Sequence, residues 1–219
     1  PIHERWWAAL MTDRMPLSDR LDAGTVICAE GFLFELERRG YLQAGAFVPE
    51  VVLEHPEMVA GLHREFVHAG SDVVQAFTYY AHREKLRLIG READLEAMNR
   101  QALRIAKEVA VESGALLAGD VCNSNVFTSA DAAAVTSTRR MFEEQVGWAA
   151  EAGVDFVIAE TLSWGEEALL ALEAIKAAGL SAVVTLAIHR DAHTWEGWTP
   201  AVACRRLEDA GADVVGLNC

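Results

Sequence analysis

The sequence predicts an α/β fold built around a parallel sheet. Residues 69–74, 152–157 and 210–215 repeat one pattern, in which an Ala-Gly pair is followed by a small residue, an aspartate and an apolar run. Glycine just past a helix end is the usual left-handed stop signal. A short apolar run behind it is typical of a strand covered on both faces. Units of this kind, repeated along one chain, predict alternating helices and parallel strands.

Six apolar runs are the predicted strands, and helical patterns lie between them. The strands are expected at residues 25–29, 72–76, 115–120, 155–160, 181–188 and 213–219. Helices are expected at residues 6–11, 32–40, 49–69, 91–113, 131–151 and 164–178, and from Pro200 onward. Asp131 is a plausible N-cap, and Pro200 is typical of a first helical turn.

A strand count of six leaves two architectures to weigh. A (β/α)8 TIM barrel has eight strands in about 250 residues, so this 219-residue chain is expected to be such a barrel, truncated after the sixth strand. Residues 1–20 would be a capping segment and residues 21–219 the barrel domain. A six-stranded doubly wound sheet is the alternative. Against it, no Gly-x-Gly-x-x-Gly turn follows the first strand, and most strands end in polar or aromatic residues.

Composition excludes several classes of protein. Hydrophobic residues make up 52% and charged residues 24%, a balance typical of a globular chain rather than a disordered one. A net charge of −14 argues against binding a nucleic-acid backbone. The chain has no apolar run of membrane-spanning length. Its four scattered cysteines are typical of reduced thiols, so we expect a cytoplasmic protein.

Polar, aromatic and thiol groups follow the predicted strands. In both architectures the chemistry lies at the carboxyl ends of the strands. The groups found there are Glu30 and Gly31, Gln75 with Phe77, Tyr79 and Tyr80, Asp120, Glu160 with Thr161, and Asn218 with Cys219. Carboxylates can hold an ammonium group, and aromatic faces can hold a methylated cation. A thiol can bind zinc or act as a nucleophile.

Each of these residues also has a purely structural interpretation. Tyr79 and Tyr80 could cap the core, and Cys219 taken alone could be a small buried hydrophobe. Asp120 could form a turn. Glu160 favours function, because a carboxylate that ends an apolar strand is costly unless it is paired. The spacing of His189 and His193 suits a metal only in a helix, and this stretch reads as a loop, so we interpret them as a solvated pair.

Taken in order, these residues resemble the zinc-dependent homocysteine S-methyltransferase family, and most closely its betaine–homocysteine methyltransferase branch. The resemblance covers nearly the whole chain from about Leu21. It includes residues 30–41, 54–57, 63–66, 69–71, 75–80, 84–86, 155–160 and 216–219.

The resemblance implies a (β/α)8 barrel that holds zinc through three cysteines. Cys219 matches one of them, and the family's other two form a Cys-Cys pair that is expected beyond residue 219. The sulfur of homocysteine would bind the zinc as a thiolate and attack the methyl group of a small onium donor, which gives methionine. A homo-oligomer is possible, and the sequence does not determine the oligomeric state.

The resemblance also assigns roles to residues at the strand ends. Glu160 matches the family's homocysteine-binding glutamate, and Glu30 would act beside it as a second catalytic residue. The expected substrate-binding residues are Gln75, Phe77, Tyr79, Tyr80, Asp120, Thr161, Asn218 and Gly31.

Three departures from the family pattern leave the donor open between a betaine, S-methylmethionine and a sulfonium relative. Glu30 stands where the family usually has aspartate. Thr161 replaces the tyrosine of the betaine branch, and Phe47 falls where that branch has tryptophan. Two aromatic groups of the donor pocket are thus changed or weakened, and Trp164, Trp195 or Trp198 could compensate for them.

Three functional hypotheses follow from the sequence. The first is a homocysteine methyltransferase. The second is a truncated barrel or pseudoenzyme that binds a ligand without turnover. The third is an unrelated barrel enzyme that uses Glu160 and Asp120 as acid and base.

Overall fold

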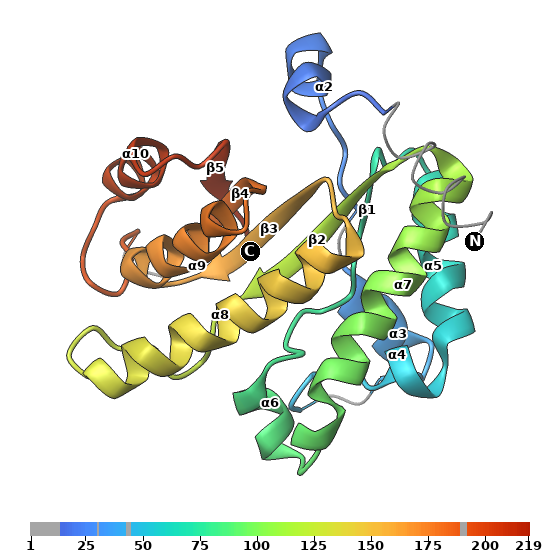
Figure 1. Cartoon of the computed structure of the whole chain (residues 1–219), viewed down its shortest axis with the longest axis horizontal. Helices are drawn as coiled ribbons and strands as arrows, with labels where there is room; N and C mark the ends of the chain where they lie inside the picture. The colour runs from blue at the N-terminus through green and yellow to red at the C-terminus, as the bar shows by residue number, and fades with distance from the viewer. Residues whose placement is uncertain (1–13, 30, 43–44, 189–191) are drawn as a thin grey trace.

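Five parallel strands form a single sheet in the computed structural model, which describes residues 14–29, 31–42, 45–188 and 192–219 (Figure 1). The strands are β1 (Val73–Gln75), β2 (Leu116–Cys122), β3 (Phe156–Leu162), β4 (Ser181–Leu186) and β5 (Val214–Leu217). Each pairs in parallel with the next strand along the chain. The predicted first strand is reduced to one parallel bridge, between Cys28 and Val73.

The order of the strands decides between the two predicted architectures. It runs β1-β2-β3-β4-β5 without reversal. A doubly wound sheet reverses its strand order at a switch point, whereas a barrel adds each strand beside the last. The barrel prediction is therefore confirmed for the described part of the chain, and the doubly wound alternative is wrong.

Helices alternate with the strands, as predicted. They are α2 (Leu17–Ala23), α3 (Phe32–Arg38), α4 (Val51–Glu54), α5 (Pro56–His68), α6 (Arg83–Leu88), α7 (Leu95–Ser113), α8 (Ala132–Ala152), α9 (Gly165–Ala177) and α10 (Pro200–Asp209), with a 3-10 turn η1 (Glu92–Asp94) before α7. The helix expected over residues 49–69 is broken at His55, because the proline that follows disfavours helical dihedrals there. The predicted N-cap is confirmed, since Asp131 Oδ1 accepts a 2.8 Å hydrogen bond from Ala133 N.

The two faces of the sheet bury different clusters. Val74, Leu117 and Val157 pack with residues of α7, α8 and α9 on the outer face. Their neighbours Val73, Leu116 and Phe156 form a second cluster, which Leu17 of α2 joins. Because strand side chains alternate between faces, this second cluster lies on the inner face of the barrel. The same alternation then directs every second residue toward the interior up to the carboxyl ends of the strands.

The aspartate of the repeated pattern has a structural role at the amino ends of the strands. Asp155 Oδ2 accepts a 2.7 Å hydrogen bond from Leu117 N, and Asp155 N donates to Leu117 O over 2.8 Å. Asp72 makes the same reciprocal pair with Ile27, and Asp213 makes it with Ala182. Each aspartate thereby satisfies a backbone N–H where the neighbouring strand begins.

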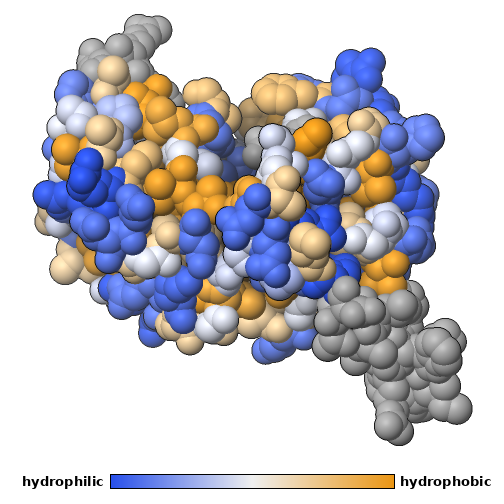
Figure 2. All heavy atoms as spheres, turned by 90° about the horizontal axis from the view of Figure 1, so that it is seen from above, coloured by the Kyte–Doolittle hydropathy of each residue, from blue (hydrophilic) through white to orange (hydrophobic). Residues whose placement is uncertain are grey.

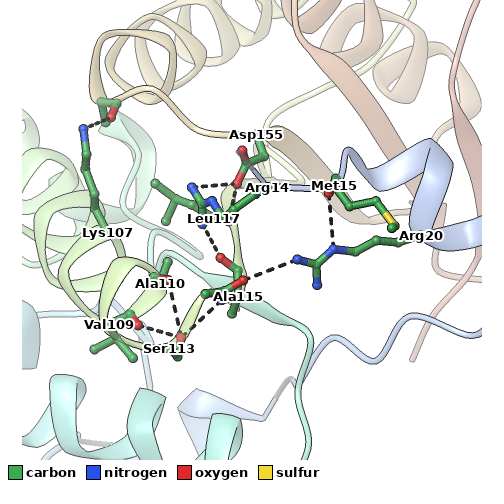
Figure 3. Close-up of polar contacts among 12 residues, drawn as sticks. Arg14, Met15, Arg20, Lys107, Val109, Ala110, Ser113, Ala115, Leu117 and Asp155 are labelled. Carbon is green, nitrogen blue, oxygen red and sulfur yellow. Dashed lines mark hydrogen bonds and ion pairs between the residues drawn. The ribbon is translucent and has the colours of Figure 1, made fainter. Parts of the chain in front are cut away.

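Arginines from the N-terminal segment cover this amino-terminal end of the sheet (Figure 3). Arg14 donates to the carbonyl of Ala115 and forms an ion pair with Asp155, with 3.3 Å between Nη2 and Oδ2. Arg20 donates to Gly114 O over 3.3 Å. Helix α2 itself lies apart from the other helices (Figure 1). Helix α2 spans the expected boundary between residues 20 and 21. The division into a capping segment and a barrel domain stays a prediction.

The surface mixes charged and apolar residues, in keeping with the composition. Patches of hydrophobic atoms alternate with hydrophilic ones on the face seen in Figure 2. No helix in the part of the chain that the structure describes is long and apolar enough to cross a membrane. The short helix expected at residues 6–11 lies outside the described residues.

Candidate active site

A pocket of about 350 Å³ lies at the carboxyl ends of the strands. The alternation that buries Val73, Leu116 and Phe156 on the inner face also directs Gln75, Asp120 and Glu160 into the barrel at this end. The pocket is lined by Gly31, Phe32, Leu33, Phe34, Phe47, Gln75, Ala76, Phe77, Tyr79, Tyr80, Asp120, Glu160, Thr161 and Cys219. Nine of the predicted site residues are in this set.

The two remaining predicted residues have different outcomes. Asn218 lies behind the pocket wall and reaches Glu160 and Thr161 through hydrogen bonds. Glu30 lies outside the described residues, so its expected role stays a prediction.

Glu160 is held from two sides by amide groups. Its Oε1 accepts a 2.7 Å hydrogen bond from Gln75 Nε2, and its Oε2 accepts one of 3.3 Å from Asn218 Nδ2. The residue is only 7% exposed. A buried carboxylate is stable only when its oxygens have partners, and here both do. The two amide groups therefore fix the orientation of the Glu160 carboxyl group on the pocket wall.

Thr161 has a strained backbone that its neighbours hold in place. Its φ is +58°, which is unusual for a β-branched residue, and the pairing of β3 with β4 shifts register here. Asn218 binds it twice, with Oδ1 accepting from Thr161 N at 3.0 Å and Nδ2 donating to Thr161 Oγ1 at 2.8 Å. Asn123 Nδ2 donates to Thr161 O at 3.0 Å. Strain of this kind persists only where surrounding contacts over-determine the geometry, and it clusters at functional sites.

Two adjacent tyrosines make an aromatic wall. The ring centroids of Tyr79 and Tyr80 are 4.4 Å apart, and burial raises the pKa of Tyr79 above its ordinary value, so its phenol is neutral. Tyr80 has a φ of +60°, and its backbone N–H donates to Cys122 Sγ over 3.3 Å. Burial raises the pKa of the Cys122 thiol. This cysteine therefore acts as a neutral acceptor that helps to hold the Tyr80 backbone.

Cys219 brings a thiol to the pocket beside Thr161. Its Sγ lies 3.9 Å from Thr161 Oγ1 and 3.6 Å from Asn218 Nδ2. Zinc sites usually have at least three protein ligands of the Cys, His, Asp or Glu type. The described residues include no group of three that could hold a metal ion. Cys219 therefore fits the role of one zinc ligand, and the part of the chain that is described does not complete a site.

The structure adds pocket residues that the sequence argument missed. These are Phe32, Leu33 and Phe34, from the start of α3. Phe47, which falls where the betaine branch has tryptophan, also lines the pocket, from the loop before α4. Phe47 reaches the pocket with a φ of +56°, a conformation that sequence patterns do not indicate for phenylalanine. Phe32 and Phe34 follow closely after Glu30, the predicted end of the first strand, and this position could have indicated that they reach the pocket.

The tryptophans considered as substitutes lie elsewhere. None of them lines the pocket among the residues that the structure describes. Trp164 packs against Phe127 and Trp195, with ring centroids 5.6 and 5.8 Å apart. Trp198 packs against Gly165 and Arg206. Of the histidine pair, His189 lies outside the described residues, so that interpretation stays a prediction.

The parallel barrel thus places a carboxylate, an aromatic wall and a thiol around one pocket at its rim. Comparison with known proteins is more specific. The family model described as homocysteine S-methyltransferase matches residues 26–219. The chain belongs to the homocysteine S-methyltransferase family.

Curated relatives agree with this assignment. Betaine–homocysteine S-methyltransferase 1 of Sus scrofa is 40% identical over 208 residues, covering 92% of this chain and 73% of that protein. The Bos taurus protein of the same name is also 40% identical, covering 92% of this chain and 50% of its own length. S-methylmethionine–homocysteine S-methyltransferase BHMT2 of Rattus norvegicus is 39% identical, with 92% and 53% covered. The chain thus spans about half the length of the cattle and rat relatives.

A solved structure supports the fold. The metallated form of the homocysteine methyltransferase MmuM from Escherichia coli superposes with a TM-score of 0.79 at 22% identity, covering 94% of this chain and 78% of that one. At this identity the likeness speaks for the fold alone.

Proposed function

We propose that the chain carries the substrate pocket of an enzyme that transfers a methyl group from a small onium donor to homocysteine and produces methionine. The observation that carries the proposal is the single pocket lined by Glu160, the Tyr79–Tyr80 wall and Cys219. An anionic anchor, aromatic faces and a thiol are the three groups that this reaction needs. The curated relatives named above act on homocysteine, with betaine or S-methylmethionine as their named donors.

The residues have distinct roles in this proposal. Glu160 would bind the ammonium group of homocysteine, since Gln75 and Asn218 keep its carboxylate in one orientation. Tyr79 and Tyr80 would contact the donor's methylated cation, at about 0.5–2 kcal/mol per cation–π contact. Glu160 is 7% exposed, and this partial removal from water strengthens its contact with a cation.

The chemical step is a displacement at carbon. The homocysteine sulfur forms a bond to the donor's methyl carbon while that carbon's bond to nitrogen or sulfur breaks. The electron pair of the broken bond stays on the leaving atom, which becomes neutral, and the thiol proton passes to solvent. The pocket's part is to hold the two reactants in line, because fixed orientation lowers the barrier of a bimolecular reaction.

We also propose that the reaction depends on zinc, with Cys219 as one ligand and two further cysteines outside the sequence described here. Bound zinc would act as a Lewis acid that keeps the homocysteine sulfur in its thiolate form at neutral pH. Thr161 and Asn218 contact Cys219 and would orient its sulfur.

The acid–base alternative has less support from the geometry. Both Glu160 oxygens accept hydrogen bonds from amide groups, an arrangement that suits a fixed anion better than a proton carrier. The methionine assay described next distinguishes the non-catalytic alternative from the proposed enzyme.

The test uses the full-length natural protein with homocysteine and a labelled methyl donor, and it measures labelled methionine. The wild type should turn over at least one of glycine betaine, S-methylmethionine or dimethylsulfoniopropionate. Glu160→Gln should raise the KM for homocysteine by about ten- to a hundredfold, because a charge-assisted contact is lost. Glu173→Gln, on the exposed side of α9, is the matched control and should change nothing. Absence of methionine with all three donors would support the non-catalytic reading.

A further inference from the structure

Lys85 of α6 lies directly over the ring of the pocket tyrosine Tyr80. Its Nζ is 3.8 Å from the ring centroid, within the range of a cation–π contact. The ring is further confined by Tyr79 and by His82, whose ring centroids lie 4.4 and 6.0 Å away. Tyr80 thus keeps one orientation, with one of its faces already occupied by a cation.

The charge of Lys85 is left unneutralised by its surroundings, unlike the other cations of α6. Arg83 pairs with Glu144 at 2.6 Å, and Arg87 pairs with Glu84 at 3.0 Å. Lys85 has no carboxylate within ion-pair distance among the residues that the structure describes, and it is only partly exposed. Burial lowers the pKa of its ammonium group. The Lys85 ammonium group therefore lies against the Tyr80 ring of the aromatic wall, outside the pocket lining.

A cation bound in the pocket would share the Tyr80 ring with this ammonium group. The quadrupole of one ring then serves two positive charges, which also repel each other across a region of low dielectric constant. A carboxylate on the same ligand would be attracted by Lys85 and would offset this repulsion. Whether repulsion or attraction by Lys85 prevails depends on the net charge of the ligand. The methylated cation is common to all donors of this type, so it does not distinguish them.

We propose that Lys85 determines donor specificity, by favouring net-neutral zwitterionic onium donors over donors that carry a net positive charge. This inference rests on the proposed function. Lys85 does not line the pocket, so it would act through Tyr80 and through space rather than by direct contact with the substrate.

Two sulfonium donors provide a matched comparison. Dimethylsulfoniopropionate is net neutral, and S-methylmethionine carries a net charge of +1 at pH 7. For the full-length protein, the ratio of kcat/KM for the first donor to that for the second should fall about three- to tenfold in Lys85→Met, because the repulsion disappears. Lys85→Arg keeps the charge and should keep the ratio. Arg104→Met, which removes one charge from the exposed face of α7, should also keep it.

A binding measurement makes the test independent of turnover. Tetramethylammonium, followed by the change in intrinsic fluorescence, should bind Lys85→Met about threefold or more tightly than the wild type. An unchanged donor ratio, equal tetramethylammonium affinities, or no binding to either protein would overturn the inference. If the wild type makes no methionine from these two donors or from glycine betaine, the proposed function fails, and the tetramethylammonium result still decides the role of Lys85.

Discussion

Gln75 Nε2 donates a 2.7 Å hydrogen bond to Glu160 Oε1, although the two residues stand on β1 and β3, with β2 between them in the sheet. In a flat sheet, strands two places apart are about 9.6 Å from each other. Curvature toward the inner face brings the two side chains together across β2. One hydrogen bond therefore links the closure of the barrel to the orientation of the carboxylate in the pocket.

Removing this bond should impair the pocket more than the fold. Gln75→Met keeps the size of the side chain but leaves Glu160 Oε1 without its amide donor, at a cost of about 1–3 kcal/mol in the binding of a ligand that needs the carboxylate in place. We expect a ten- to hundredfold loss in kcat/KM for homocysteine in steady-state assays. Gln101→Met on α7 is the control, since Gln101 Oε1 accepts hydrogen bonds from Arg104 on the same helix. Equal effects of the two variants would contradict the role of Gln75.

Cys219 should be required for both metal binding and activity. Cys219→Ser replaces a soft thiolate with a hydroxyl that binds zinc poorly, so bound zinc measured by atomic absorption should fall by at least tenfold. EDTA should abolish activity in the wild type, and added zinc should restore it. Cys204→Ser on α10 is the matched control and should retain zinc and activity. Retained zinc in Cys219→Ser would exclude this residue as a ligand.

Two buried histidines predict a loss of stability in mild acid. Burial lowers the pKa of His63 to about 3 and that of His82 to about 4, from 6.5 in the unfolded chain. Between pH 6.5 and these values the unfolded state binds more protons. The free energy of unfolding therefore falls as the pH falls, by up to about 1.4 kcal/mol per pH unit for each histidine. Urea unfolding at pH 7 and at pH 5 should show a loss of about 2 kcal/mol for each.

Substitution separates these histidines from the carboxylates, which titrate mainly below pH 5. His63→Leu should reduce the difference between pH 7 and pH 5 by about half, whatever its stability at pH 7. The exposed His68→Leu is the control and should leave the difference unchanged. An undiminished difference in His63→Leu would mean that the His63 ring of the wild type is protonated in the folded state at pH 5.

Two glycines should respond oppositely to alanine. A Cβ on Gly119 of β2 would lie 2.9 Å from Ala149 Cβ of α8 and 3.3 Å from Val157 Cγ2. Gly119→Ala should therefore lower the free energy of unfolding by about 1–3 kcal/mol, since the helix must move away from the sheet. Gly147 of α8 has open space around the same position, and Gly147→Ala should raise it by about 0.5–1 kcal/mol through helix propensity. Denaturant unfolding of both variants compares the two values directly.

Residues that face the barrel interior at the strand ends could be predicted from the sequence. The Gly-x-Asp pattern marked where strands begin, because each aspartate binds a backbone N–H of the neighbouring strand. Counting from there with a period of two directs Gln75, Glu160 and Asn218 inward. These are local rules, so they need no knowledge of the rest of the fold.

Other features of the pocket depend on contacts between distant segments. Phe47 enters from a loop without periodicity, and its left-handed backbone is not a preference of phenylalanine. Thr161 adopts a strained φ because Asn123 and Asn218, which are far from it in the chain, hold it by hydrogen bonds.

The sequence by itself determined the alternation of helices and parallel strands and the identity of the groups at the strand ends, since both follow from local periodicity and turn chemistry. Tertiary structure alone decided that Phe32 and Phe34 join the pocket, that the tryptophans do not, and how the Glu160 carboxylate is oriented. Those outcomes are set by packing and hydrogen bonds between residues far apart in the chain, which no local pattern encodes.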